Sequence, residues 1–134
     1  MAPSDLTDRA VDGLAVRRRV LGDAYVDKSL EAATDFSAPL QDFVHENCWG
    51  LVWTREALDL KTRSMITLSA LAGSGKWSEF TTHARGALNN GWTLEELREL
   101  VFHLAVYLGV PTALEAFRAL APLAAEHTPT NDLR

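Results

Sequence analysis

A carboxylate and an imidazole lie four residues apart in this sequence, at Glu79 and His83. Residues at positions i and i+4 of an α-helix share one face, so a helix over residues 76–89 would present the two side chains together. A carboxylate beside an imidazole can orient the ring, raise its pKa and move protons. The same spacing also occurs in solvated Glu–His pairs on helix surfaces, and spacing alone favours that interpretation.

Two arginines, Arg55 and Arg63, flank the start of an apolar segment. The planar guanidinium fork matches a carboxylate, so these residues are candidates for binding an acidic ligand. Each also has a structural explanation. Arg63 stands four residues after Asp59 and could pair with it along a helix, and Arg55 could be a charge on a surface loop.

Two further pairs stand at helical i, i+4 spacing. His103 and Tyr107 are polar residues in an otherwise apolar helix, where they would line a pocket or serve as satisfied core or interface residues. Trp49 and Trp53 would wall a pocket and exclude water, although a core or subunit-interface role is favoured. His45 is expected on the exposed side of its helix.

Composition limits the classes of function. The chain has 134 residues, 47% of them hydrophobic, which fits one domain spanning residues 1–134. A net charge of −5 argues against nucleic acid or an anionic membrane as a partner, and an acidic ligand would need a local cluster of arginines. The single cysteine, Cys48, excludes a disulfide framework or a zinc quartet within one chain, and it is expected in the core. The start of the chain is polar and the longest apolar run, residues 65–72, is too short to cross a bilayer, so we expect a cytoplasmic protein.

Helical periodicity dominates the sequence, and no strand alternation stands out. We therefore predict an all-α fold of six or seven helices. Residues 1–8 and 127–134 are expected to be flexible. The helices at 59–71 and 93–108 are apolar on several sides, which predicts that copies of the chain cover each other in a homo-oligomer. The expected helices cover residues 12–21, 23–33, 37–53, 59–71, 76–89, 93–108 and 111–126.

Four separated segments carry a resemblance to a known family. They are GLAVRRRVLGDAYVD (13–27), CWGLVWTREALDLKTRS (48–64), HARGALNNG (83–91) with Glu79 four residues before it, and AVYLGVP (105–111). Together they resemble the carboxymuconolactone decarboxylase family over residues 13–120. The resemblance implies an all-α fold of the alkylhydroperoxidase D type and a ring-shaped oligomer, either a trimer or a hexamer.

Thiol chemistry is excluded by the same comparison. The redox branch of that superfamily carries the pattern C-x-x-C-x-x-x-H. Counting back from His83, its two cysteine positions hold Lys76 and Glu79 here, and its upstream carboxylate falls at about Ser64. Without an attacking and a resolving cysteine, peroxidase activity is not expected.

The resemblance also implies an activity and reverses the preference at Glu79 and His83. The implied reaction converts 4-carboxymuconolactone to 3-oxoadipate enol-lactone and CO2, in the protocatechuate branch of the β-ketoadipate pathway. The substrate is a small dianionic lactone with its own electron sink, so we expect neither a metal nor another cofactor. The alternatives are a related decarboxylase or isomerase acting on another carboxylated lactone or enolisable acid, and a non-catalytic oligomeric binding module.

Residues of the site follow from the resemblance together with the residue types. We predict His83, Glu79 and Arg63 as catalytic residues, with the proton donor left open between His83 and Glu79. The predicted substrate-binding residues are Arg55, Trp49, Trp53, His103 and Tyr107.

Overall fold

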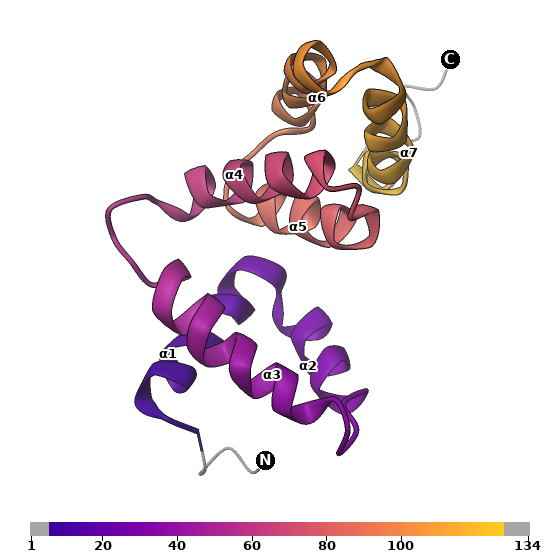
Figure 1. The fold of residues 1–134 in the computed structure, drawn as a ribbon. Helices are drawn as coiled ribbons and strands as arrows, with labels where there is room; N and C mark the ends of the chain where they lie inside the picture. The colour runs from indigo at the N-terminus through magenta and orange to yellow at the C-terminus, as the bar shows by residue number, and fades with distance from the viewer. Residues whose placement is uncertain (1–5, 128–134) are drawn as a thin grey trace. The chain divides into compact units, whose positions relative to one another are not determined.

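A computed structural model describes residues 6–127, which contain seven α-helices, one π-helix and no strand (Figure 1). The all-α prediction is confirmed. The flexible ends predicted at 1–5 and 128–134 lie outside the described residues, whereas Asp8 and His127 are helical. The elements are α1 (Asp8–Leu21), α2 (Asp23–Glu31), α3 (Ala38–Val44), the π-helix η2 (His45–Trp53), α4 (Leu60–Gly73), α5 (Trp77–Asn89), α6 (Leu94–Leu108) and α7 (Val110–His127).

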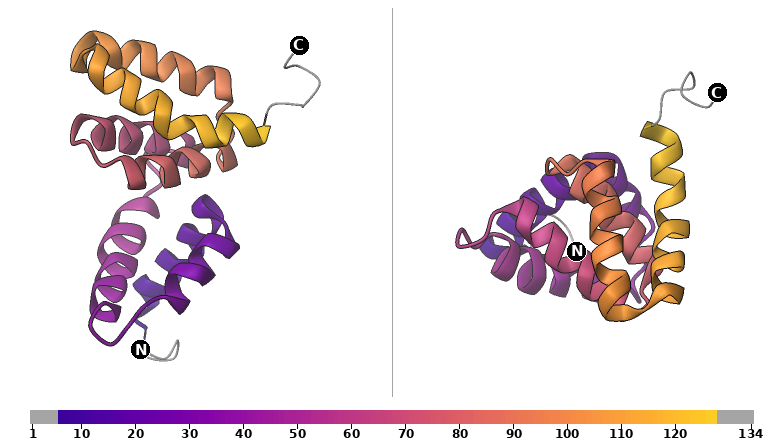
Figure 2. Two further views of the ribbon diagram at one scale, coloured as in Figure 1. Left: turned by 90° about the vertical axis from the view of Figure 1, so that its right-hand side faces the viewer. Right: turned by 90° about the horizontal axis from the view of Figure 1, so that it is seen from above.

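The chain divides into two compact units, Met1–Arg63 and Ser64–Arg134. In the first unit, α1 packs against both α2 and η2. In the second unit, α7 packs against α5 and α6, and Figure 2 shows α6 and α7 running side by side. The first turn of α4 belongs to the first unit and the rest of α4 to the second.

Local capping chemistry sets several helix ends where the sequence predicts them. The Thr93 hydroxyl accepts from the backbone N–H of Glu96, and the Glu96 carboxylate accepts from the N–H of Thr93, each at 3.1 Å. This is a capping box. Asp59 accepts from the Thr62 N–H at 2.7 Å and so begins α4. Gly91, at φ 101°, follows the C-cap Asn90, a conformation that favours glycine.

The predicted helix over residues 37–53 is interrupted in its geometry. It begins as the α-helix α3 and continues from His45 as the π-helix η2. A π-helix turn holds more residues than an α-helix turn, so side chains after His45 point in directions that a 3.6-residue period does not predict. This change of phase bears on the exposure of Cys48, which is described below.

A close backbone crossing joins α1 to η2. A Cβ atom on Gly13 would overlap the carbonyl oxygen of His45 and lie 2.5 Å from the Gly50 nitrogen. A Cβ atom on Gly50 would overlap the backbone of Arg9. Glycine at both positions therefore permits the two helices to touch.

Each unit has its own hydrophobic core. Val20, Leu21, Val26, Trp49 and Trp53 form the core of the first unit. In the second unit, a larger core brings residues of α4–α7 together, and burying one such large side chain stabilises a fold by about 1.5–3 kcal/mol. The fully buried hydrophobic residues of this second core are Leu68, Phe80, Ala84, Ala87, Val101 and Leu123.

The first prediction concerns the close crossing of Gly13 and Gly50. Gly13→Ala should lower the free energy of unfolding by at least about 2 kcal/mol, because the clash is with backbone atoms that cannot rotate away. Urea denaturation monitored by circular dichroism measures the loss. Gly73→Ala is the matched control: its Cβ would lie 3.8 Å from Leu108, so its stability should stay within about 1 kcal/mol of wild type. A Gly13→Ala protein as stable as wild type would show that the helices do not cross this closely.

Candidate active site

His83 lies on α5 in the second unit and is partly buried, with its Nδ1 atom inside the protein. Glu79 lies one turn earlier and is exposed. Among residues 6–127, no hydrogen bond or ion pair joins the Glu79 carboxylate to His83. The two side chains occupy the same side of α5, as predicted, but the carboxylate does not orient the imidazole in this structure.

A buried polar contact lies on the same side of α5. The Asn90 side chain donates through Nδ2 to the hydroxyl of Ser64 at 2.9 Å, and Ser64 is fully buried. Asn90 follows His83 by seven residues, about two helical turns, so both residues lie along one side of the helix. Ser64 stands at about the position where the redox branch carries its upstream carboxylate, and neither Ser64 nor Asn90 was among the predicted site residues. An amide and a hydroxyl here supply neutral donors where the redox relatives carry a carboxylate.

The two predicted arginines meet in the first unit. Arg63 donates through Nη2 to the backbone carbonyl oxygen of Arg55 at 3.0 Å. Arg63 is half-buried, whereas Arg55 is exposed. The Asp59 carboxylate, the alternative partner of Arg63, accepts from Thr62, and hydrogen bonds from Thr62 lower the pKa of the Asp59 carboxyl below its usual value. The loop between η2 and α4 therefore holds Arg63 beside Arg55 through backbone contact.

The tryptophans are core residues of the first unit. Trp49 and Trp53 are 3% and 6% exposed, and their ring centroids lie 4.7 Å apart. This confirms the favoured interpretation of both residues as core. A further role in binding substrate stays a prediction.

His103 and Tyr107 stack on the surface of α6, with ring centroids 5.2 Å apart. His103 lines a pocket of about 630 Å³ in the second unit. Three carboxylates also line this pocket, and their charge repels a dianion, so its electrostatics suit an apolar or cationic ligand better. Tyr107 is 74% exposed. The other lining residues are Met65, Ser69, Trp92, Glu95, Glu96, Glu99, Leu100 and Leu104.

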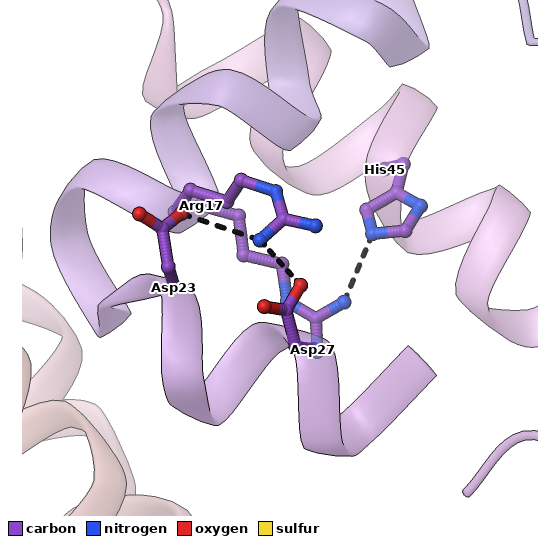
Figure 3. A network of polar contacts seen from close by, with 5 residues as sticks. Arg17, Asp23, Asp27 and His45 are labelled. Atoms are coloured by element: carbon purple, nitrogen blue, oxygen red, sulfur yellow. Dashed lines mark hydrogen bonds and ion pairs between the residues drawn. The ribbon is translucent and has the colours of Figure 1, made fainter. Parts of the chain in front are cut away.

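A buried polar cluster that the sequence analysis missed lies in the first unit (Figure 3). Arg17 donates through Nη1 to Nε2 of His45 at 2.9 Å and to Oε1 of Gln41 at 2.8 Å. Its Nη2 donates to the hydroxyl of Ser29 at 3.1 Å, and the Gln41 amide donates to the same hydroxyl at 3.0 Å. These contacts tie α1, α2, α3 and η2 together. We call Arg17, Ser29, Gln41 and His45 the arginine cluster.

Two expectations for this region are wrong. His45, expected to be exposed, is 2% exposed, and Cys48, expected in the core, is exposed. The π-helical turns after His45 change the direction of later side chains, which bears on Cys48, whereas His45 is buried by the close crossing of α1 and by its contact with Arg17. Arg17 stands one turn after Gly13 on α1, so the close crossing at Gly13 also buries Arg17, which is 7% exposed.

The arginine cluster fixes the protonation of His45. A guanidinium can only donate, so Nε2 of His45 is the acceptor and the ring proton resides on Nδ1. Burial lowers the pKa of His45 below its usual value, and the charge of Arg17 lowers it further. Burial also lowers the pKa of the Arg17 guanidinium, which starts far above neutrality. At pH 7 the pair is therefore a cation beside a neutral imidazole.

Comparison with known proteins places this chain in a family. The model of the carboxymuconolactone decarboxylase family matches residues 38–122. The chain belongs to that family. Over 105 residues it is 48% identical to a nitrosuccinic acid decarboxylase of Metarhizium robertsii, covering 78% of this chain and 73% of the relative. Over 105 residues it is also 41% identical to a 4-carboxymuconolactone decarboxylase of Acinetobacter baylyi, covering 78% of each protein. Both relatives are decarboxylases, which supports decarboxylation as the reaction of this chain.

Two kinds of feature are absent from the described residues. No helix between residues 6 and 127 is long and apolar enough to cross a membrane. Within the same range, no group of three or more histidine, cysteine and acidic side chains is arranged to hold a metal ion.

The second prediction concerns the pH dependence of stability that follows from the lowered pKa of His45. Its folded-state pKa lies below the usual value of 6.5, so below pH 6.5 the unfolded chain binds a proton that the folded chain excludes. The contribution of His45 to the free energy of unfolding should be constant above that pH and should fall as the pH drops towards the folded-state pKa. Urea denaturation at pH 8 and pH 5.5 measures the difference.

His45→Gln is the matched variant for this measurement, because glutamine offers Arg17 an acceptor oxygen without titrating. Its stability should fall less between pH 8 and pH 5.5 than that of wild type. Equal losses in the two proteins would contradict the assignment, because the other histidines would then explain the whole effect.

Proposed function

We propose that this chain catalyses decarboxylation of a small dicarboxylic acid whose leaving carboxylate is attached beside an electron-accepting group. The observation that carries the proposal is identity above 40% to two decarboxylases, each over 105 residues. The acids in the names of these relatives share one chemical property. In each, the electron pair released from the breaking C–C bond has a place to go within the substrate.

The first candidate substrate is 4-carboxymuconolactone. Its leaving carboxylate is attached to the ring carbon next to the ring oxygen. A C=C bond connects that carbon to the lactone carbonyl. When the C–C bond breaks, CO2 leaves and the electron pair moves into that carbonyl as a dienolate. One proton then adds to carbon and gives 3-oxoadipate enol-lactone. The four sequence segments that resemble this family support this substrate.

The second candidate is nitrosuccinic acid, which is favoured by the 48% identity to the Metarhizium robertsii enzyme. Its leaving carboxylate shares a carbon with a nitro group. Loss of CO2 moves the electron pair into the nitro group as a nitronate, and one proton then adds to carbon. Both reactions require the same three tasks: holding the carboxylates, stabilising developing negative charge on oxygen, and delivering a proton to carbon.

Residues of the chain suit each task. Arg63, with Arg55 beside it, provides a guanidinium for a substrate carboxylate. His83 is partly buried, which suits a donor that must act away from bulk water, and it would stabilise the oxyanion or protonate carbon. Glu79 is exposed whereas His83 is partly buried, which favours His83 over Glu79 as the proton donor. Asn90, along the same side of α5, carries a further neutral donor.

The proposed reaction needs no added cofactor, because the substrate itself accepts the electron pair. Two alternatives predict other outcomes. A related enzyme on this scaffold would turn over another carboxylated lactone or enolisable acid but neither candidate. A non-catalytic binding module would turn over none of them.

Turnover of the two acids gives the third prediction. Purified protein should release CO2 from 4-carboxymuconolactone or from nitrosuccinic acid at a rate proportional to enzyme concentration. His83→Ala should lower kcat by about 10²–10⁴-fold if His83 acts as the general acid. Arg63→Ala should lower kcat/KM by about 10–100-fold, the value of one charge-assisted hydrogen bond.

Arg85→Ala is the control for both variants. Arg85 lies two residues after His83 but forms a two-pronged ion pair with Glu126, at 2.8 and 3.2 Å. Its removal should leave kcat/KM within about twofold of wild type, since a surface ion pair contributes little. Release of CO2 from neither acid would sink the proposal. Full activity in both His83→Ala and Arg63→Ala would show that the site is misplaced.

We also propose that the chain forms a homo-oligomer, the state expected from its sequence. An exposed apolar surface on α6 and α7 supports this, because so much apolar area is unusual on a soluble monomer. Phe102 and Phe117 pack edge to face on it, with ring centroids 6.1 Å apart. The surface consists of Phe102, Val106, Val110, Leu114 and Phe117, which are 39–80% exposed.

The fourth prediction concerns this surface. Wild type should sediment at a multiple of the chain mass, and a trimer or hexamer is expected. Val106→Glu should reduce the mass, because it places a charge in the apolar contact, whereas the near-isosteric Val106→Thr should reduce it less. Sedimentation equilibrium at micromolar concentration makes the comparison. A monomeric wild type would contradict the proposal.

A further inference from the structure

The charge of Arg17 has no counterion within the described part of the chain. Its three hydrogen-bond partners, Gln41, His45 and Ser29, are all neutral. A buried cation is normally paired with an anion, because burial without one is costly. Arg17 is 93% buried and lacks this compensation.

Two acidic side chains of α2 bind the neighbouring arginine, Arg18, instead. Asp27 and Asp23 bind Arg18 at 2.7 and 3.2 Å (Figure 3). Cys48 also lies within electrostatic range of Arg17. Although this residue is exposed, partial desolvation of its thiol raises the thiol pKa, so it stays uncharged near neutrality. The first unit thus has acidic groups close by, and the fold pairs them with the more exposed Arg18.

Arg17 also has N–H groups that its three hydrogen-bond contacts do not use. A guanidinium carries five N–H groups, and the contacts to His45, Gln41 and Ser29 use three of them. The two that remain are the Nε–H and one N–H on Nη2, which lie on adjacent nitrogens of the fork. Two adjacent N–H groups are the arrangement that receives the two oxygens of a carboxylate.

The cluster contains a second buried donor without a partner among the described residues, on the side of the His45 ring that faces away from Arg17 (Figure 3). His45 is 98% buried, and its Nδ1–H has no acceptor within residues 6–127. Native proteins pair almost all such buried groups, and exceptions often mark a binding site. The close crossing at Gly13 and Gly50 holds both side chains in place, so these donors are oriented before any ligand arrives.

We propose that Arg17 is a carboxylate-binding residue for a small dicarboxylate, positioned by Ser29, Gln41 and His45. The Nε–H and the remaining Nη2–H of Arg17 bind one carboxylate, whose charge compensates the buried guanidinium. That the natural ligand is the substrate rests on the proposed function, but the presence of the binding site does not. Arg17 lies outside residues 38–122, the segment that the family model matches.

Thermal unfolding in sodium succinate tests the proposal, with sodium chloride at equal ionic strength as the reference. Succinate is a dicarboxylate without an electron sink, so it reports binding without turnover. Wild-type Tm should rise by about 4 °C when succinate is about tenfold above its Kd. Arg17→Met should abolish this rise, and Arg17→Lys should reduce it, because lysine keeps the charge but loses the fork.

Arg18→Met is the matched control, one residue along the same helix. It removes an arginine that is paired with Asp23 and Asp27, so the succinate-dependent rise should equal that of wild type. A wild-type Tm that rises no more in succinate than in chloride would overturn the proposal. An equal rise in Arg17→Met would also overturn it.

A measurement on wild type keeps the test decisive if Arg17→Met does not fold. In protein labelled with ¹⁵N-arginine, the Nε–H resonance of Arg17 should shift with succinate and saturate. An unmoved resonance overturns the proposal. Turnover then separates the two proposals: succinate binding at Arg17 without decarboxylation of either acid would sink the proposed function alone. Decarboxylation without succinate binding would sink only the assignment of Arg17.

Discussion

The first unit depends on one close contact, the crossing of α1 and η2 where Gly13 faces Gly50. No Cβ fits at either position, so the two helix backbones touch. One turn along α1, that contact places Arg17 against His45 and buries both. The same crossing keeps Trp49 and Trp53 stacked in the core. A small residue pair thus determines where the most unusual charge in the chain resides.

Individual arginines, rather than the net charge of the chain, would have to attract an anionic substrate. The chain carries −5 overall, which by itself repels an anionic substrate. Attraction must therefore come from individual arginines whose charge is not already neutralised. Arg18 and Arg85 are paired with carboxylates, whereas the contacts of Arg17 are to neutral atoms. The pocket beside His103 is lined by carboxylates, whose negative charge would repel a dianionic substrate.

Features encoded by neighbouring residues were predictable. The all-α class, the Thr93–Glu96 capping box and the Asp59 cap all follow from local periodicity and hydrogen bonding, and the structure contains each. The burial of Arg17 and His45 was not predictable in this way. It depends on contact between segments more than 25 residues apart, which no local pattern encodes.

The site residues could be predicted from the sequence only in part, for the same reason. Helical spacing placed Glu79 and His83 on one side of α5, but it does not report exposure, and Glu79 faces solvent. The central claim is that the substrate's own electron sink, with protein donors and arginines around it, suffices for decarboxylation. The most direct measurement is NMR of the products in deuterium oxide with a metal chelator present. One of the two acids should lose CO2 and gain deuterium, on the carbon beside the lactone carbonyl for 4-carboxymuconolactone or on the nitro-bearing carbon for nitrosuccinic acid. Both acids remaining unchanged would contradict the account.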